Sequence, residues 1–233
     1  MINMSNYAVS DLHGCYNQWK AIQTFCKEND RIYVLGDCID RSPEGFDTLK
    51  SVMRDPRTTL IRGNHEQMMA DALAEERDYG YSDYWMWIWF NNGGKSTYDA
   101  WQEDGRKFDW ISTINHLPLW AKYTNAQGQE IIMNHSGITP KAGWSVADMA
   151  PKELLWNRDH LRALKWHRAE NEIVVHGHTP ILSMSQFKNQ EIEIEPGAFW
   201  YCENHKVNID NGGVWTGDIC LLDLDTWDEH IFS

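Results

Sequence analysis

The chain has 233 residues, 42% of them hydrophobic and 24% charged, and a formal net charge of −13. This size and composition predict one globular domain that spans residues 1–233 around a single sizeable core. The acidic balance argues against nucleic acid as a partner, because binding to a phosphate backbone normally requires a basic face.

The N-terminus and the cysteines set two further limits. No uninterrupted apolar run approaches membrane-spanning length, and residues 1–6 contain neither a basic region nor a long apolar segment. The five cysteines are odd in number and include no Cys-x-x-Cys pair, which favours reduced thiols. We therefore expect a cytoplasmic protein without a membrane partner.

The first polar motif follows a short predicted strand, residues 7–10. That strand runs into Asp11-Leu12-His13-Gly14, where the glycine permits a tight turn. An Asp-x-His pair on an extended turn can offer a carboxylate oxygen and an imidazole nitrogen to one metal ion, and these donors suit Mn, Fe or Zn. Alone the pair is a weak motif, and a chance turn is the more common explanation.

The second motif has the same design. An apolar run over residues 33–35 meets Gly36-Asp37, which places Asp37 at the end of a buried strand. In open α/β sheets, ligands bind beyond the carboxyl ends of the strands. Asp40 and Arg41 follow on the loop, and Ser42-Pro43 is typical of a helix N-cap and first helical residue.

A third strand is predicted over residues 58–61, and it runs into Arg62-Gly63-Asn64-His65-Glu66. The next residues, 67–76, are rich in good helix formers. Asn64 and His65 therefore lie where a strand ends and a helix begins, a position that favours anions through free N–H groups and the helix dipole. A plain helix cap at Asn64 and a surface histidine at His65 are the structural alternatives.

Residues 79–90 are dense in aromatic side chains. Buried helix is the favoured interpretation, because Trp-rich runs usually pack in a core. The alternative is a surface on which a nucleobase or another aromatic substrate stacks. After Asn91-Asn92-Gly93-Gly94, residues 95–102 are predicted to be helical again.

Two more predicted strands end in histidines. Residues 119–123 and 130–133 are expected to form a hairpin, whose second strand runs into Asn134-His135-Ser136. The strand at residues 172–175 is closed by His176-Gly177-His178-Thr179-Pro180. The remaining predicted elements are a helix and two β-like segments, at residues 151–164, 207–210 and 219–222.

Together the five strand ends supply carboxylates, an amide and imidazoles, and no cysteine. This is a donor set for two divalent ions that share one carboxylate. Each motif has a structural alternative, but all of those alternatives would have to hold at once. The side chains gathered in this way are Asp11, His13, Asp37, Asn64, His65, His135 and His178.

These motifs carry a family resemblance. In chain order, Asp-x-His-Gly, Gly-Asp-x-x-Asp-Arg, Gly-Asn-His-Glu, His-x-Gly and Gly-His-Thr-Pro resemble those of the calcineurin-like metallophosphoesterases. Within that group they look like the phosphoprotein phosphatases, especially the small bacterial and bacteriophage Ser/Thr protein phosphatases. The resemblance implies an α/β (α+β) fold, a two-layer β-sandwich of mixed sheets flanked by helices, with metals at the sheet edge.

Carried over motif by motif, the resemblance implies a metal centre. It would hold two divalent ions, with Mn expected and Fe, Zn or Ni as alternatives. Asp37 would bridge the two ions, and His176 would lie behind the ligands without binding metal. The first ion would be held by Asp11, His13 and Asp37, and the second by Asp37, Asn64, His135 and His178.

The resemblance also implies roles in catalysis. A hydroxide that bridges the ions would attack the phosphorus of a phosphate ester. His65 would protonate the leaving group, Asp40 would hold the tautomer of His65, and Arg41 would neutralise phosphate charge. The substrate-binding residues would be Arg41, Arg158, Arg62 and Asn64.

Three functions follow as hypotheses. The leading one is a metal-dependent phosphomonoesterase that acts on phosphoserine or phosphothreonine proteins, with a small phosphoester as the other possible substrate. The second is a symmetrical dinucleoside-tetraphosphate hydrolase, which would need room for two nucleosides. The third is a non-catalytic metal-dependent scaffold, which Asp40, His65 and Arg41 disfavour, because a scaffold needs no general acid.

Overall fold

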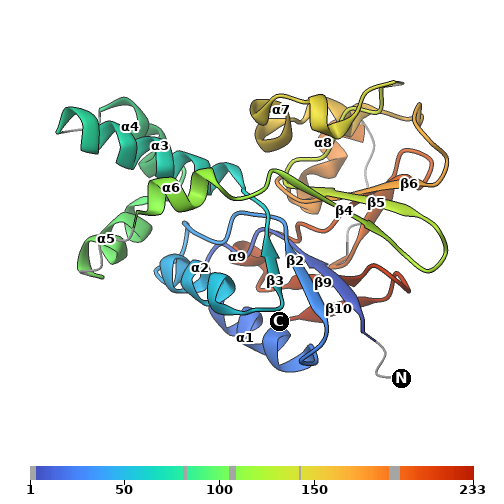
Figure 1. Cartoon of the computed structure of the whole chain (residues 1–233), viewed down its shortest axis with the longest axis horizontal. Helices are drawn as coiled ribbons and strands as arrows, with labels where there is room; N and C mark the ends of the chain where they lie inside the picture. Colours follow the sequence, from blue (N-terminus) through green and yellow to red (C-terminus); the bar gives the residue numbers. More distant parts are fainter. Residues whose placement is uncertain (1–3, 81–82, 105–108, 142, 189–194) are drawn as a thin grey trace.

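The structure, a computed structural model, describes residues 4–80, 83–104, 109–141, 143–188 and 195–233, and two five-stranded sheets form its centre (Figure 1). The first sheet contains, from edge to edge, β10 (Glu229–Phe232), β9 (Ile219–Asp223), β1 (Asn6–Val9), β2 (Arg31–Val34) and β3 (Thr58–Leu60). The second sheet contains β4 (Trp120–Thr124), β5 (Glu130–Asn134), β6 (Glu172–His176), β8 (Lys206–Asn208) and β7 (Phe199–Tyr201).

Both sheets are mixed. In the first, β1, β2 and β3 are parallel, whereas β9 and β10 pair antiparallel at one side. In the second, β5, β6 and β8 are parallel, and β4 and β7 form antiparallel edges. Parallel neighbours end at the same edge of a sheet, so the loops that follow them lie side by side.

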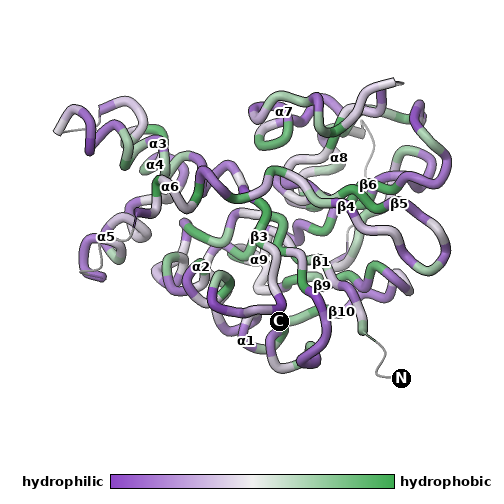
Figure 2. The backbone as a smooth tube through the Cα atoms, viewed as in Figure 1, coloured by the Kyte–Doolittle hydropathy of each residue, from purple (hydrophilic) through white to green (hydrophobic). Residues whose placement is uncertain are grey.

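Alternation along the strands explains how the sheets pack. In β1, Ala8 belongs to the apolar cluster between the two sheets, whereas Val9 faces the helices on the outside. In β6, Val175 lies in the cluster between the sheets and Val174 in the outer one. Because successive side chains of a strand point to opposite faces, each sheet is buried on both sides. Figure 2 accordingly shows hydrophobic residues concentrated on the central strands.

Helices cover both outer faces. The first sheet is covered by α1 (Tyr16–Phe25) and α2 (Gly45–Arg54), which bury Trp19 and Phe46 among other residues. The second sheet is covered by α7 (Pro151–Trp156), α8 (Met184–Lys188) and the short 3₁₀ helices Val146–Asp148, Asp159–Arg162 and Ile181–Ser183. The expected two-layer sandwich of mixed sheets flanked by helices is therefore confirmed.

A helical arm projects from the sandwich, at the left of Figure 1. It consists of α3 (Asn64–Tyr79), α4 (Tyr84–Asn91), α5 (Lys95–Glu103) and α6 (Trp110–Asn115). The prediction that the aromatic segment is buried holds only in part: Trp85, Ile88 and Phe90 are half-buried against the core, and residues 81–82 lie outside the described residues. Trp89 is fully buried at the base of the arm, but Tyr84 and Trp87 are 61% and 66% exposed.

Three other expectations need correction. The helix expected from Pro43 begins at Gly45, after a turn in which the Ser42 carbonyl accepts the Gly45 N–H and the Ser42 hydroxyl accepts the Glu44 N–H. The helix expected over residues 151–164 ends at Trp156, and Asn157 is extended. The short strands β7 and β10 were not predicted.

No helix among the described residues is long and apolar enough to cross a bilayer.

Candidate active site

Loops from both sheets meet at one place. Those after β1, β2 and β3 come from the first sheet, and those after β5 and β6 come from the second. Backbone hydrogen bonds lock neighbouring loops together, such as His13 N–H to the Asp37 carbonyl at 2.8 Å and Gly177 N–H to the His135 carbonyl at 2.9 Å. The loops carry seven buried side chains that were predicted as a group: Asp11, His13, Asp37, Asn64, His65, His135 and His178.

The loops are tight and strained. Asp11, His13, Asp37 and His178 have positive φ values of 52°, 40°, 54° and 70°, in the left-handed region that favours glycine. Each such residue costs about 1–3 kcal/mol, and strain of this kind is retained where it orients functional groups. Here it turns four donor side chains away from extended strands and into one volume.

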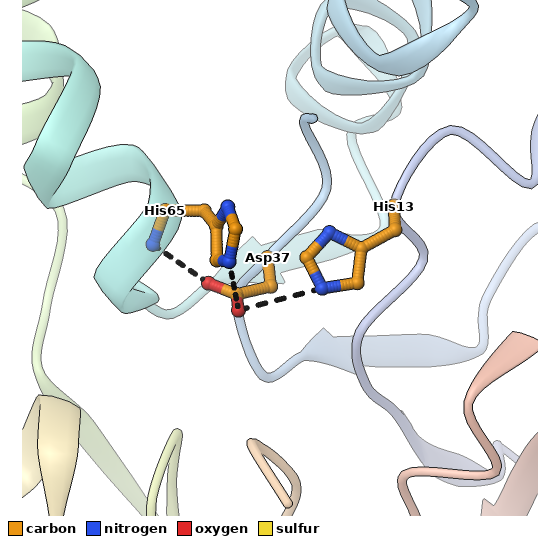
Figure 3. Close-up of side chains that lie close together, drawn as sticks. All are labelled: His13, Asp37 and His65. Carbon is orange, nitrogen blue, oxygen red and sulfur yellow. Dashed lines mark hydrogen bonds and ion pairs between the residues drawn. The ribbon is translucent and has the colours of Figure 1, made fainter. Parts of the chain in front are cut away.

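The first donor group consists of His13, Asp37 and His65 (Figure 3). His13 Nε2 lies 3.6 Å from Asp37 Oδ2, and His65 Nε2 lies 3.8 Å from the same oxygen. His13 donates its Nδ1–H to the Ile39 carbonyl at 2.7 Å, so its Nε2 carries a lone pair. That Nε2 is buried and has no hydrogen-bond partner among the described residues, as expected of a nitrogen reserved for a metal.

The second donor group consists of Asp37, His135 and His178, with Asn64 beside them. His135 Nε2 lies 3.4 Å from Asp37 Oδ2 and 2.8 Å from Asn64 Oδ1. Because His135 donates its Nδ1–H to the Leu35 carbonyl, its Nε2 and the Asn64 oxygen face each other with lone pairs. A cation between these atoms would turn this repulsive contact into coordination.

The electrostatics fit bound cations as well. Burial, reinforced by the negative charges of Asp11 and Glu66, raises the pKa of the Asp37 carboxyl well above its usual value. Burial also lowers the pKa values of His13 and His178 well below the usual one, which keeps the rings neutral and able to coordinate. A bound metal reverses the penalty on the carboxylate. The described residues thus form two groups able to hold a metal ion, and the groups share Asp37.

Asp11 is placed differently from the expectation. It lies outside the two donor groups, and His65 lies in the first group instead. Asp11 Oδ2 accepts the His178 N–H at 2.9 Å and also the Ser10 hydroxyl. Asp11 therefore joins the loops after β1 and β6, and its other oxygen is the atom that could face a metal.

His65 sits in a hydrogen-bonded chain with its two predicted partners. Its Nδ1–H donates to Asp40 Oδ2 at 2.6 Å, and its Nε2 accepts from the Arg41 guanidinium at 3.1 Å. Trp89, buried at the base of the arm, donates its indole N–H to the same Asp40 oxygen at 2.8 Å. Burial raises the pKa of Asp40 to about 7 and, with the Arg41 charge, lowers that of His65. These hydrogen bonds connect Trp89 of the arm directly to His65 and Arg41 in the site.

The other predicted arginines differ in position. The Arg158 guanidinium is near Asp11, Asp210 and Asp37, and its Nε donates to the Thr179 hydroxyl at 3.2 Å. Arg62 is not brought to the site. Its guanidinium donates to Gln67 and to two carbonyls at the end of α6, so it fixes the arm to the sandwich.

His176 is buried and lies outside the two donor groups. Its Nε2 is 2.7 Å from the Tyr201 hydroxyl, which lies 3.0 Å from His160 Nδ1. His160 in turn donates Nε2–H to the Ser136 carbonyl at 2.6 Å, next to His135. This buried network holds the loop that presents His135. Tyr201 and His160 were not predicted from the sequence, because neither belongs to a strand-end motif.

Glu66, for which the sequence predicted no role, holds three backbone N–H groups of the site loops. Its carboxylate accepts the N–H groups of Asp37, Cys38 and Gly63 at 2.8, 2.8 and 3.0 Å. It is fully buried at the start of α3. Its position three residues after Gly63 fits a capping residue, a local signal that could have suggested one of these three contacts.

Comparison with known proteins gives the family. The model of the calcineurin-like phosphoesterases matches residues 4–209. Serine/threonine-protein phosphatase 1 of Salmonella typhimurium is 24% identical over 82% of this chain and 86% of the relative. Serine/threonine-protein phosphatase 2 of Escherichia coli is 27% identical over 82% of this chain and 87% of the relative.

Relatives of a second kind are also similar. The symmetrical bis(5'-nucleosyl)-tetraphosphatase of Wigglesworthia glossinidia brevipalpis is 36% identical over 63% of this chain, which spans only 48% of that relative. A solved structure provisionally assigned as a diadenosine tetraphosphatase superposes with a TM-score of 0.66 at 13% identity, covering 99% of this chain and 93% of the other. That similarity concerns the fold alone. From the family match over most of its length, the chain belongs to the calcineurin-like phosphoesterases.

Proposed function

We propose that this protein is a metal-dependent phosphomonoesterase that hydrolyses phosphoserine or phosphothreonine in proteins. The observation that carries the proposal is the position of Asp37. It is shared by two buried donor groups, and its Oδ2 lies 3.8 Å from His65, the centre of the Asp40–His65–Arg41 chain. Metal donors and a candidate proton donor thus converge on one carboxylate.

The donor groups suit two divalent cations, with Mn as the expected metal because the donors are oxygen and imidazole nitrogen without sulfur. Asp37 and His13 would contribute to the first, together with the second carboxylate oxygen of Asp11, so that His65 Nε2 stays available for the leaving group. The second would be held by Asp37, Asn64, His135 and His178. When bound, such ions make a water acidic enough to act as a nucleophile at neutral pH and offset the charge of a phosphate.

The protein's own side chains would do the remaining work. Arg158 and Arg41 provide guanidinium groups for the phosphate oxygens. In the structure Arg41 donates to His65 Nε2. A charge-assisted bond to phosphate is stronger than one to a neutral imidazole, so we expect substrate to draw Arg41 away. Once the Arg41 charge, which lowers the pKa of His65, has moved to the phosphate, Nε2 can take up a proton from water, and Asp40 at Nδ1 stabilises the doubly protonated ring. That Nε2–H then faces the leaving oxygen and donates the proton to it.

The choice of a protein substrate rests on the comparisons. The two Ser/Thr phosphatase relatives align over 86% and 87% of their lengths, whereas the tetraphosphatase of Wigglesworthia aligns over 48% of its length. About half of that tetraphosphatase therefore lies outside the alignment. Symmetrical dinucleoside-tetraphosphate hydrolysis remains the second candidate, because the tetraphosphatase of Wigglesworthia is 36% identical to this chain over the aligned part.

A side-by-side assay tests the proposal. The purified chain is stripped with a chelator, reloaded with Mn, and given a phosphoserine peptide and diadenosine tetraphosphate in separate reactions. We expect metal-dependent release of phosphate from the peptide at a much higher kcat/KM than cleavage of the dinucleotide. Preference for diadenosine tetraphosphate would overturn the protein-phosphatase assignment, and full activity of the stripped chain would overturn the metal-dependent one.

A further inference from the structure

An open cavity of about 480 Å³ adjoins the proposed phosphate site. It lies between the end of α4 and α9 (Gly213–Thr216) and shares one wall residue, Arg41, with the site just described. Arg41 donates to His65 on one side and lies against the cavity on the other. The lining residues are Arg41, Asn91, Asn92, Gly93, Val214 and Trp215.

Glycines fix the walls of this cavity to Arg41. The Arg41 N–H donates to the Gly93 carbonyl at 3.1 Å, and a Cβ on Gly93 would lie only 3.0 Å from Arg41 Cγ. Gly93 also has a φ of +96°, which other residues rarely adopt. On the opposite wall, Trp215 packs on Gly212, and its ring centroid is 4.9 Å from the Arg41 guanidinium carbon. The cavity therefore has a defined shape relative to the site.

The lining chemistry combines an apolar surface with hydrogen-bond acceptors. Trp215 is 63% exposed although it lies against Arg41. Asn91 and Asn92 donate their Nδ2 groups to the α4 carbonyls of Trp87 and Ile88 at 2.8 and 2.9 Å. Their Oδ1 atoms are consequently the atoms that can accept from a ligand N–H. Such walls suit a ligand with N–H donors and an apolar side chain.

We propose that this cavity is a subsite for the polypeptide that carries the phosphoserine, with Trp215 contacting an aromatic or large apolar side chain beside it. The inference rests on the proposed function: Arg41 contacts His65, the proposed proton donor, at 3.1 Å and also lines the cavity, so the cavity adjoins the place of the leaving group. Because the cavity is open, a continuous polypeptide can lie across it. A nucleoside, whose base could also stack on Trp215 and donate N–H groups to the asparagine oxygens, is the competing occupant that the test below separates. Under this proposal, Trp215 determines which side chain beside the phosphoserine is preferred.

The test compares short peptides that contain one phosphoserine among glycines with the same peptides carrying one Phe at each position in turn. With Mn-loaded wild type, we expect the best Phe position to raise kcat/KM about 10-fold, the scale of a buried aromatic anchor. Trp215→Ala should abolish that gain while leaving hydrolysis of the all-glycine peptide within about 3-fold. Trp215→Phe should restore most of the gain. The matched control is Trp87→Ala, which removes an equally exposed tryptophan outside the cavity lining. This variant should retain the full gain in kcat/KM from the Phe residue.

The outcomes separate the subsite from the function on which it rests. Peptide hydrolysis without any Phe preference, or a preference that survives in Trp215→Ala, would overturn the subsite and leave the phosphatase assignment intact. An equal loss on all peptides in Trp215→Ala would also overturn it, and would assign Trp215 to holding Arg41. If peptides are not hydrolysed and Trp215→Ala impairs only diadenosine tetraphosphate cleavage, both the phosphatase assignment and the polypeptide subsite fail.

Discussion

Removal of the Glu66 carboxylate should cost more stability than any ordinary helix cap. In Glu66→Ala, the N–H groups of Asp37, Cys38 and Gly63 lose their acceptor inside the protein. Each buried unsatisfied N–H costs about 1–3 kcal/mol, so three give a range of about 3–9 kcal/mol. Loss of the carboxylate also removes its own desolvation cost, which burial imposes and which raises its pKa. We therefore expect about 3–5 kcal/mol of destabilisation, in the lower part of the range.

The chain offers a matched control. Glu153 occupies the same position in α7, where its carboxylate accepts the Ala150 N–H at 2.9 Å, but that contact is exposed and single. Glu153→Ala should cost about 1 kcal/mol or less. Urea unfolding of metal-free protein measures both variants, with thermal unfolding expected to drop about 10 °C or more for Glu66→Ala. Equal effects of the two substitutions would refute the argument that three buried N–H groups depend on Glu66.

Three further predictions concern the metals, the proton donor and a distant ion pair. Asp37→Asn should lose more bound Mn than Asp11→Asn, because Asp37 belongs to both donor groups; similar metal contents would contradict this. His65→Asn should retain metal and lower kcat on phosphoserine peptides by about 10²–10⁴, but less on p-nitrophenyl phosphate, whose leaving group needs no proton; loss of metal would instead make His65 a ligand. Arg57→Lys breaks a two-point contact with Asp55, at 2.9 and 2.7 Å, and also the guanidinium bonds to the Cys26 and Gln23 carbonyls; it should cost about 1–2 kcal/mol in unfolding near pH 7. Arg57 lowers the pKa of Asp55 to about 2, so this difference should shrink as the pH falls from about 4 towards 2, and a difference independent of pH would refute the ion pair as its source.

The donor side chains could be predicted because each lies within a few residues of a hydrophobic strand. A run such as residues 33–35 identifies a strand, and the residue type at its end gives the chemistry. Parallel pairing of β1, β2 and β3 then brings the ends together. Spacing could not show which oxygen or nitrogen is free. The commitment of Asp11 Oδ2 to the His178 N–H depends on a contact between the two sheets.

Tertiary contacts also explain what the sequence did not reveal. The helix expected over residues 151–164 stops at Asn157, because the backbone there leaves the helix and contacts the loop after β5. The Asn157 N–H donates to the Ser136 hydroxyl at 3.1 Å. Arg62 follows a strand end like the other site residues, but carbonyls at the end of α6 capture its guanidinium. In α4, apolar residues surround the whole helix, so the pattern gave no indication of which face Trp89 would bury.

Metal stoichiometry measured together with turnover tests the central claim most directly. The chelator-stripped chain is titrated with Mn, the bound ions per chain are counted by elemental analysis after removal of free metal, and phosphopeptide hydrolysis is measured at each point. The shared position of Asp37 predicts that activity appears only as the second ion per chain is bound. Full activity with one ion, or with none, would contradict a site built around a carboxylate shared by two metals.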